Sequence, residues 1–521
     1  MSGAHGRTAV VVGGGVAGLA TAGLLAADGW EVDLLEQGDA LGGRAGSWEE
    51  GGFRFDTGPS WYLMPEVFDH FFALMGTSTA AELDLVRLDP GYRVFSEGHD
   101  EPIDIAADRA ANVALFESVQ PGGGTALEDY LDSAQTAYRL ALKHFLYSSF
   151  QSRRALLAPE IVRNGARLSG LLSRSLETHV AGRFTDPRLR QVLGYPAVFL
   201  GTSPDRAPSL YHLMSWLDLA DGVRYPMGGF TTLVDALARV AERAGARLHT
   251  GVPVTRIRTT GGTGKPRATG VETAGGERYD ADLVVGAADL HHVETTMLPR
   301  ELQTYPESWW AKRDPGPGAV LAMLGVEGEL PELAHHSLFF TRDWHQNFGD
   351  VFDTRRVPEP ASAYVCRPSA TDPTVAPPGH ENLFVLVPVP ADPGLGGGGD
   401  PAVEKAADAA IAQTAAWAGV PDLAERIVVR RTVGPADFAS GLNAWSGGAL
   451  GPAHVLSQSA FFRAGNASRK VDSLLYAGAS TIPGIGLPMC LISAELVLKR
   501  TRGDRSVRPL PAPLAGRTDA A

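Results

Sequence analysis

The sequence predicts an α/β fold with a Rossmann-like dinucleotide-binding domain. Two strand–turn–helix units indicate it. One lies over residues 9–36, where a second strand follows the helix, and the other lies over residues 474–500. Parallel sheets covered by helices are built from units of this kind.

Length, composition and charge limit the number of domains and the classes of partner that the chain can have. At 521 residues the chain is long enough for roughly three domains of about 150 residues each, and its 44% apolar and 20% charged residues are typical of a globular protein. The formal charge of −13 argues against nucleic acid as a partner. No secretory signal precedes the first strand, and no apolar run reaches the length of about 18 residues that a spanning helix needs. Any membrane contact is therefore expected from one side only.

The first unit carries a nucleotide-binding fingerprint. A buried strand at residues 9–12 leads into Gly13, Gly15 and Gly18, which form a GxGxxG motif, and the second strand ends in Glu36. Gly13 would permit the tight turn, Gly15 would let a pyrophosphate approach the helix N-terminus, and Gly18 would allow close packing of helix on strand. Glu36 would accept hydrogen bonds from ribose hydroxyls. This context, rather than the motif alone, predicts a dinucleotide site.

A second glycine turn follows at Gly42, Gly43 and Arg44. Its backbone N–H groups and the forked guanidinium of Arg44 suit a phosphate and favour FAD over NAD. At this point the sequence resembles the flavin-containing amine oxidase-like superfamily, in which GGR follows the dinucleotide fold. The FxxDxGP-like run at residues 53–59 narrows the resemblance to the bacterial-type phytoene desaturases.

Similar stretches continue from about residue 8 to residue 500, including RYPMGGFTTLVDALARVAERAGARLHTGVPVTRI. The resemblance implies that the strand in this stretch brings the backbone around Val254 to the adenine pocket. It also implies a discontinuous organisation, in which an α+β substrate domain with a helical membrane-facing insertion interrupts the FAD-binding domain. The expected segments are 1–80, 225–295 and 440–505 for FAD binding, 81–224 and 296–439 for the substrate, and 506–521 for a disordered tail.

In this resemblance the last unit, LLYAGASTIPGIGLPMCLISAELVLKR, returns to the first lobe. Gly478, Gly486 and Leu487 would then lie at the flavin, and the helix starting near Pro488 would direct its positive end toward the flavin pyrimidine. The turn lacks the acid that many superfamily members have there. Contacts to the ribityl chain would come from the backbone or from the hydroxyl residues Ser480 and Thr481. The alternative is a terminal helix with no role in the site.

The stretch from residue 138 to residue 190 holds ten basic and three acidic residues within an acidic chain. Aromatic and aliphatic side chains are interspersed with the arginines, among them Arg153, Arg154, Arg163 and Arg167. Such a mixture predicts an amphipathic segment bound to a membrane surface. An ordinary solvated helix face is the alternative. Because carotenes reside in bilayers, the resemblance favours the membrane, with the protein in the cytoplasm and peripheral on the inner face of the cell membrane.

The implied reaction is desaturation of a carotene such as phytoene to neurosporene- or lycopene-type products. An allylic hydride would pass to the flavin and an adjacent proton would be lost. Asp132 is a candidate proton acceptor, since a carboxylate beside an apolar tunnel is tuned by desolvation. No second nucleotide fingerprint is expected, because prolines interrupt the approach to GLGGGGD at residues 394–400, so oxygen or a quinone is the expected electron acceptor.

No metal site is expected, because the adjacent pairs His291–His292 and His335–His336 should point in different directions. Cys366 and Cys490 are expected to be small buried hydrophobes. Three functions stay open. They are a carotene desaturase, a related C30 desaturase, ketolase or isomerase, and a prenyl-lipid carrier of the same fold that does not use FAD.

Overall fold

The computed structural model describes residues 6–151, 159–261 and 264–514. A parallel sheet in the order β19-β13-β1-β2-β9 forms the first lobe. Its strands come from three separate parts of the chain: β1 (Thr8–Val12), β2 (Glu31–Leu35), β9 (Arg247–His249), β13 (Leu283–Gly286) and β19 (Leu474–Tyr476). The predicted α/β fold with a Rossmann-like sheet is thus confirmed.

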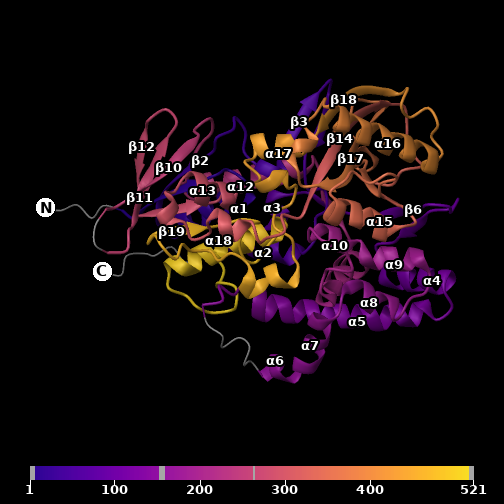
Figure 1. The fold of residues 1–521 in the computed structure, drawn as a ribbon, viewed down its shortest axis with the longest axis horizontal. Helices are drawn as coiled ribbons and strands as arrows, with labels where there is room; N and C mark the ends of the chain where they lie inside the picture. Colours follow the sequence, from indigo (N-terminus) through magenta and orange to yellow (C-terminus); the bar gives the residue numbers. More distant parts are fainter. Residues whose placement is uncertain (1–5, 152–158, 262–263, 515–521) are drawn as a thin grey trace.

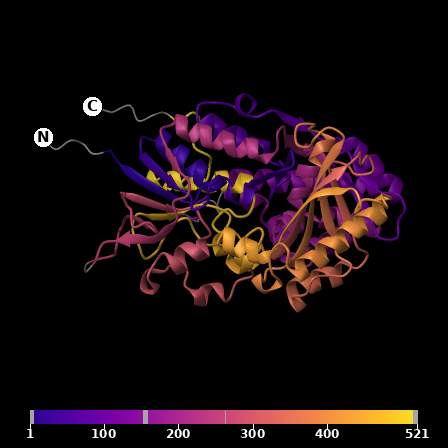
Figure 2. The same cartoon turned by 90° about the horizontal axis from the view of Figure 1, so that it is seen from above.

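Helices cover one face of this sheet. Helix α1 (Val16–Ala27) packs against α12 (Phe230–Arg243) and α18 (Leu487–Thr501), and Figure 2 shows the yellow C-terminal helix beside the indigo N-terminal segment. Almost every residue of α1 is buried, because alanines and glycines let its neighbours approach on all sides. On the other face, Val10 and Val12 pack with an antiparallel sheet of β10 (Val254–Thr259), β11 (Ala268–Thr273) and β12 (Arg278–Asp280).

The second lobe is built on a mixed seven-stranded sheet in the order β18-β14-β17-β16-β15-β6-β7, which lies at the far end of the molecule from β10–β12 (Figure 1). Helix α16 (Pro401–Ala418) covers it with an alanine-rich face. Its strands are β6 (Tyr92–Ser96), β7 (Ile103–Ile105), β14 (Pro317–Glu327), β15 (His336–Phe340), β16 (Ala363–Cys366), β17 (His380–Pro390) and β18 (Ile427–Val433).

A helical layer lies below this sheet, and α6 and α7 project from its lower edge (Figure 1). It consists of α4 (Arg109–Val119), α5 (Gly123–Ala141), α6 (Pro159–Arg163), α7 (Gly165–Ser173), α8 (Leu176–Ala181), α9 (Pro187–Gly194) and α10 (Pro196–Phe199). Arg153 and Arg154 lie outside the described residues, so the predicted membrane segment is described only in part.

The remaining helices and strands are β3 (Ser47–Glu50), β4 (Phe53–Asp56), α2 (Pro65–Leu74), α3 (Thr79–Glu82), β5 (Leu85–Arg87), α11 (Met214–Trp216), β8 (Arg224–Pro226), α13 (Leu290–Thr296), α14 (Glu307–Trp310), α15 (Trp344–Gly349) and α17 (Pro435–Gly441).

The prediction of a disordered tail from residue 506 is wrong for residues 506–514, which pack on the first lobe. The fully buried ammonium of Lys499 donates to the carbonyls of Tyr147, Ser506 and Arg508 at 2.9, 2.7 and 2.8 Å. The N–H of Leu510 donates to the buried carboxylate of Glu495 at 2.6 Å. Two buried charged side chains on α18 thus hold the tail in place. The proline-rich composition of the tail gave no indication of these contacts.

Deletion of residues 505–521 is expected to destabilise the fold. It removes two of the three carbonyls that accept from the Lys499 ammonium and the N–H that donates to Glu495, and a hydrogen bond to a charged group contributes about 1.5–3 kcal/mol. The measurement is the free energy of unfolding in denaturant. Deletion of residues 515–521 alone is the control, because it retains all of these contacts. Equal stability of both truncated proteins would contradict the role given to the tail.

Candidate functional site

A cavity of about 2270 Å³ lies between the two lobes and the helical layer. Drug-sized ligands occupy pockets of about 300–1,000 Å³, so this one has room for a dinucleotide and a long second ligand. Its walls include residues of the segment 36–47 in the first lobe and aromatic side chains such as Trp61, Tyr364 and Phe384. Further wall residues come from the helical layer and from the segment 456–462.

The first glycine turn has the geometry expected from its spacing. Gly13 adopts a φ of 106°, which side chains rarely tolerate, and a Cβ on Gly18 would lie 1.9 Å from the carbonyl oxygen of Gly13. These two glycines are therefore required by the fold. Gly15 differs, because it has an ordinary φ of −72° and a Cβ there would meet only the Gly42 carbonyl oxygen, at 3.7 Å. The space in front of Gly15 is open, as a site for pyrophosphate requires.

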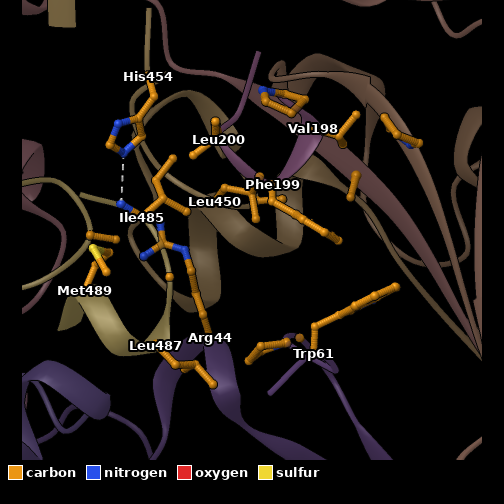
Figure 3. Close-up of a pocket in the computed structure, with 18 of the residues that line it drawn as sticks. Arg44, Trp61, Val198, Phe199, Leu200, Leu450, His454, Ile485, Leu487 and Met489 are labelled. Atoms are coloured by element: carbon orange, nitrogen blue, oxygen red, sulfur yellow. Dashed lines mark hydrogen bonds between the residues drawn. The ribbon is translucent and has the colours of Figure 1, made fainter. Parts of the chain in front are cut away.

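The second glycine turn lies against the first. The N–H of Gly42 donates to the carbonyl of Gly14 at 2.9 Å, and a Cβ on Gly43 would lie 3.4 Å from the Cα of Gly15. Arg44 extends from this turn into the cavity, where it lies beside Leu487 (Figure 3). Its guanidinium is 3.5 Å from the carboxylate of Asp289, but its Nε is buried without a hydrogen-bond partner.

Glu36 lines the same end of the cavity. Its carboxylate accepts hydrogen bonds from the N–H groups of Gly14 and Gly38, at 2.6 and 2.8 Å, and these fix its position. The N–H of Val252 donates to the Glu36 carbonyl at 2.8 Å, which brings the start of β10 to this edge. Val254 itself is buried in the first-lobe core and is not among the cavity-lining residues, so a contact with adenine stays a prediction.

The C-terminal turn reaches the cavity from the other side. Gly486 has a φ of 115° and precedes α18, which begins at Leu487, one residue earlier than predicted. Both residues line the cavity, and no side chain caps the helix N-terminus. Gly478 has a φ of 117° and donates its N–H to the hydroxyl of Ser493 at 3.1 Å. Gly478 is not among the residues that line the cavity, whereas its neighbour Ala479 is.

The proposed ribityl contact from the Thr481 side chain is wrong. Its hydroxyl lies inside the protein, where it donates to the Gly478 carbonyl at 3.0 Å and lies 3.3 Å from the amide of Asn466. Ser480 is also buried and is not among the cavity-lining residues. The contact to the ribityl chain is therefore expected from backbone groups of the turn.

Two residues that the sequence did not single out support the turn. The imidazole of His454 lines the cavity and its Nε2 accepts the N–H of Ile485 at 3.1 Å (Figure 3). Burial holds the pKa of His454 well below its usual range, so the ring stays neutral and can accept. The buried guanidinium of Arg463 donates to the carbonyls of Ala479 and Thr481, and burial lowers its pKa to about 10. Neither residue belongs to a recognisable motif.

These features fit FAD. Within the described residues, the N-terminus of α18 has no side-chain cap and the Nε of Arg44 has no hydrogen-bond partner, and both Leu487 and Arg44 line the cavity. The buried cation of Arg463 supports the wall residue Ala479. The N-terminus of α1 is adjacent to the Gly42–Gly43 turn, but its glycines are not among the lining residues. These helix ends and cations place positive potential where a pyrophosphate or an electron-rich ring would be stabilised. Glu36 lies at the end where the ribose of a dinucleotide is expected.

Asp132 does not belong to this site. Its carboxylate on α5 is 69% exposed, forms a salt bridge of 2.7 Å with Arg109, and is not among the cavity-lining groups. The geometry does not support a role as proton acceptor. Asp132 follows Leu131, which is fully buried, so the apolar face of α5 is turned to the core and Asp132 is turned to solvent.

The expectation that neighbouring histidines point apart is wrong for His335 and His336. Their rings lie 4.6 Å apart, and their ligand atoms lie within 4.8 Å of each other and of the Cys366 sulfur. His335 comes just before β15, so strand alternation does not separate the pair. Burial raises the pKa of the Cys366 thiol to about 12, so the thiol is protonated at neutral pH when no metal is bound.

Comparison with known proteins adds to this geometry. The family model described as flavin-containing amine oxidoreductase matches residues 16–497. A carotenoid 3,4-desaturase of Haloarcula japonica is 41% identical over 495 residues, which cover 95% of this chain and 98% of the relative. A zeta-carotene-forming phytoene desaturase of Myxococcus xanthus is 36% identical over 500 residues, with coverages of 95% and 94%.

Among solved structures, an oxidoreductase from Methanosarcina mazei superimposes with a TM-score of 0.58 over 95% of this chain and all of its own. The two sequences are 17% identical. This likeness supports the fold alone.

Proposed function

The chain belongs to the flavin-containing amine oxidoreductase family, and we propose that it desaturates a long-chain carotene. It is an FAD-dependent oxidoreductase that acts on CH–CH groups. Phytoene, converted to neurosporene- or lycopene-type products, is the substrate we favour. Relatives named as phytoene and carotenoid desaturases support this choice over a ketolase, an isomerase or a carrier.

The single observation that carries the proposal is the continuous cavity. Its lining combines Glu36, Gly43 and Arg44 with many apolar side chains and with aromatic rings such as that of Trp61. Trp61 packs in it against Phe199 and stacks on His336, with ring centroids 5.4 and 4.4 Å apart. A flexible polyene lacks polar groups, so apolar walls must hold it in position.

When bound, FAD accepts a hydride from an allylic carbon. The chain provides binding, orientation and exclusion of water. Arg44 and the start of α1 would hold the pyrophosphate, while the N-terminus of α18 would face the flavin ring. The neutral His454 ring holds the Ile485 N–H and thereby the position of that helix end.

The test is expression of the chain in cells that accumulate phytoene and, separately, in cells that accumulate lycopene. Coloured carotenes with additional conjugated double bonds are expected. Products that carry carbonyl groups would indicate a ketolase, and products with unchanged double-bond number but altered geometry would indicate an isomerase. A colourless purified protein with unchanged carotenes would indicate a carrier and contradict the proposal.

We also propose that the open end of the cavity rests on the inner face of the cell membrane. Exposed apolar side chains support it: Val162 and Leu172 on α6 and α7, and Phe461 and Phe462 nearby. Phe461 packs on Phe150 with ring centroids 4.4 Å apart, and both residues line the cavity. Within the described residues, no helix is both long and apolar enough to cross a bilayer. The proposed electron acceptor is oxygen or a membrane quinone.

Charge reversal at Arg163 and Arg167 is expected to weaken binding to anionic liposomes. Each basic residue near such a surface contributes about 1 kcal/mol, so the double variant should bind at least tenfold more weakly. Sedimentation with liposomes measures this, and high salt should have a similar effect. The matched control reverses the exposed Arg278 and Lys312 in other parts of the molecule. Equal loss in both double variants, or no binding by the native protein, would favour the solvated-face alternative.

A further inference from the structure

A buried carboxylate lies behind the wall of the cavity. Asp218 is 3% exposed and sits in a π-helical turn over Leu217–Asp221, next to the cavity-lining Leu217. Its Oδ2 accepts hydrogen bonds from the hydroxyls of Tyr195 and Tyr92, at 2.7 and 3.1 Å, while its Oδ1 is buried without a partner. A buried acid near a cavity is a candidate for a functional role as well as a structural one.

The ionisable side chains around Asp218 include three tyrosines, namely Tyr92 on β6, Tyr130 on α5 and Tyr195 after α9. Within the described residues Asp218 forms no salt bridge. Burial raises its pKa to about 7, although the two tyrosine hydroxyls oppose this shift. Asp218 can therefore take up or release a proton near neutral pH.

Of the two tyrosines, only Tyr195 is among the residues that line the cavity. Tyr195 is a lining residue and packs against Phe199 and Trp61, with ring centroids 5.5 and 6.1 Å apart. Figure 3 shows Phe199 and Trp61 at the cavity. Tyr92 bonds to the same carboxylate oxygen from inside the core and is not a lining residue. Tyr195 is thus the link between Asp218 and a bound substrate.

We propose that Tyr195 and Asp218 form the proton relay of the desaturation. The inference rests on the proposed function and assigns the base that Asp132 does not provide. Bound FAD would take a hydride with its two electrons from an allylic carbon, and the neighbouring carbon must then lose a proton. The Tyr195 oxygen takes that proton while its own passes to Asp218 Oδ2, and the electron pair of the broken C–H bond completes the new double bond. Afterwards the proton returns through Tyr195 to water.

The two tyrosines provide a matched pair of variants. Tyr195→Phe and Tyr92→Phe each remove one hydrogen bond to the same oxygen, so a purely structural role predicts similar losses. The relay predicts that kcat falls at least 10²-fold in Tyr195→Phe and less than about tenfold in Tyr92→Phe, since general base catalysis contributes about 10²–10⁴-fold. FAD content and carotene binding should be retained in both.

The pH dependence gives a second test. Asp218 must be ionised to accept a proton, so kcat of the native protein should fall about tenfold per pH unit below about 7. Asp218→Asn should have low turnover without this dependence. Independently of turnover, infrared difference spectra of the holoprotein should show a carboxyl band that titrates near pH 7 and is missing in Asp218→Asn.

The outcomes are distinguishable. If the native protein desaturates carotenes but both phenylalanine variants lose turnover equally, or if no carboxyl band titrates near neutral pH, the relay is overturned and the proposed function stands. If the native holoprotein desaturates no carotene, the proposed function is overturned and the relay with it.

Discussion

Gly15→Val is expected to give a folded protein without flavin. Gly15 has an ordinary backbone conformation, and among the described residues an added Cβ would meet the Gly42 carbonyl oxygen alone, at 3.7 Å, so the apoprotein has room for a Cβ. That side chain would fill the space before the first N–H groups of α1, which a pyrophosphate must approach. The measurements are flavin absorbance after purification and thermal unfolding. We expect a colourless protein that unfolds cooperatively.

Variants of two other glycines serve as controls that distinguish a loss of flavin binding from a general loss of folding. Gly18→Val should fail to fold, because its Cβ would lie 1.9 Å from the Gly13 carbonyl oxygen. Gly170→Val should retain both fold and flavin, because a Cβ on this helix meets nothing within 4 Å. Full flavin absorbance in Gly15→Val would contradict the assignment of the pyrophosphate site.

Gly486→Val is expected to lower the reduction potential of the bound flavin and to reduce turnover about 10²-fold or more, as loss of a good electrostatic donor does. The N-terminus of α18 has no side-chain cap and opens on the cavity, so its partial positive charge can stabilise a reduced, negatively charged flavin. A side chain at a φ of 115° would displace this helix end. Weaker stabilisation of the reduced form makes the potential more negative.

Gly503→Val is the matched control for this variant. Gly503 follows the opposite end of the same helix, also has a positive φ, and has no neighbour within 4 Å of an added Cβ. It should also suffer backbone strain, smaller at its φ of 69° than at the φ of 115° of Gly486, without a change in potential. A near-native potential and turnover in Gly486→Val would show that α18 only closes the domain.

Features set by local spacing could be predicted from the sequence. The positive φ of Gly13 and the close approach at Gly18 follow from a strand, a turn and a helix within a few residues. The turn before α18 also follows from local spacing, although the helix begins at Leu487 and not at the predicted Pro488. In each case neighbours in sequence decide the backbone conformation.

Features that depend on distant partners could not be predicted. His454 meets Ile485 across 31 residues, and Asp218 meets Tyr92 across 126. Neither pairing leaves a pattern in the sequence. Asp132 was selected because it is a carboxylate on a helix near an apolar segment, but which side of α5 faces the cavity depends on packing with other elements. The direction of the Thr481 side chain is likewise set by Asn466 and Ser493.

The most direct test of the account is to mix the oxidised holoprotein with phytoene-containing liposomes in the absence of oxygen and quinones. The account predicts loss of oxidised-flavin absorbance together with new conjugated double bonds in equal molar amounts, and no further product until an acceptor is added. Flavin that stays oxidised while carotene binds, or product that forms without flavin reduction, would contradict FAD-dependent desaturation.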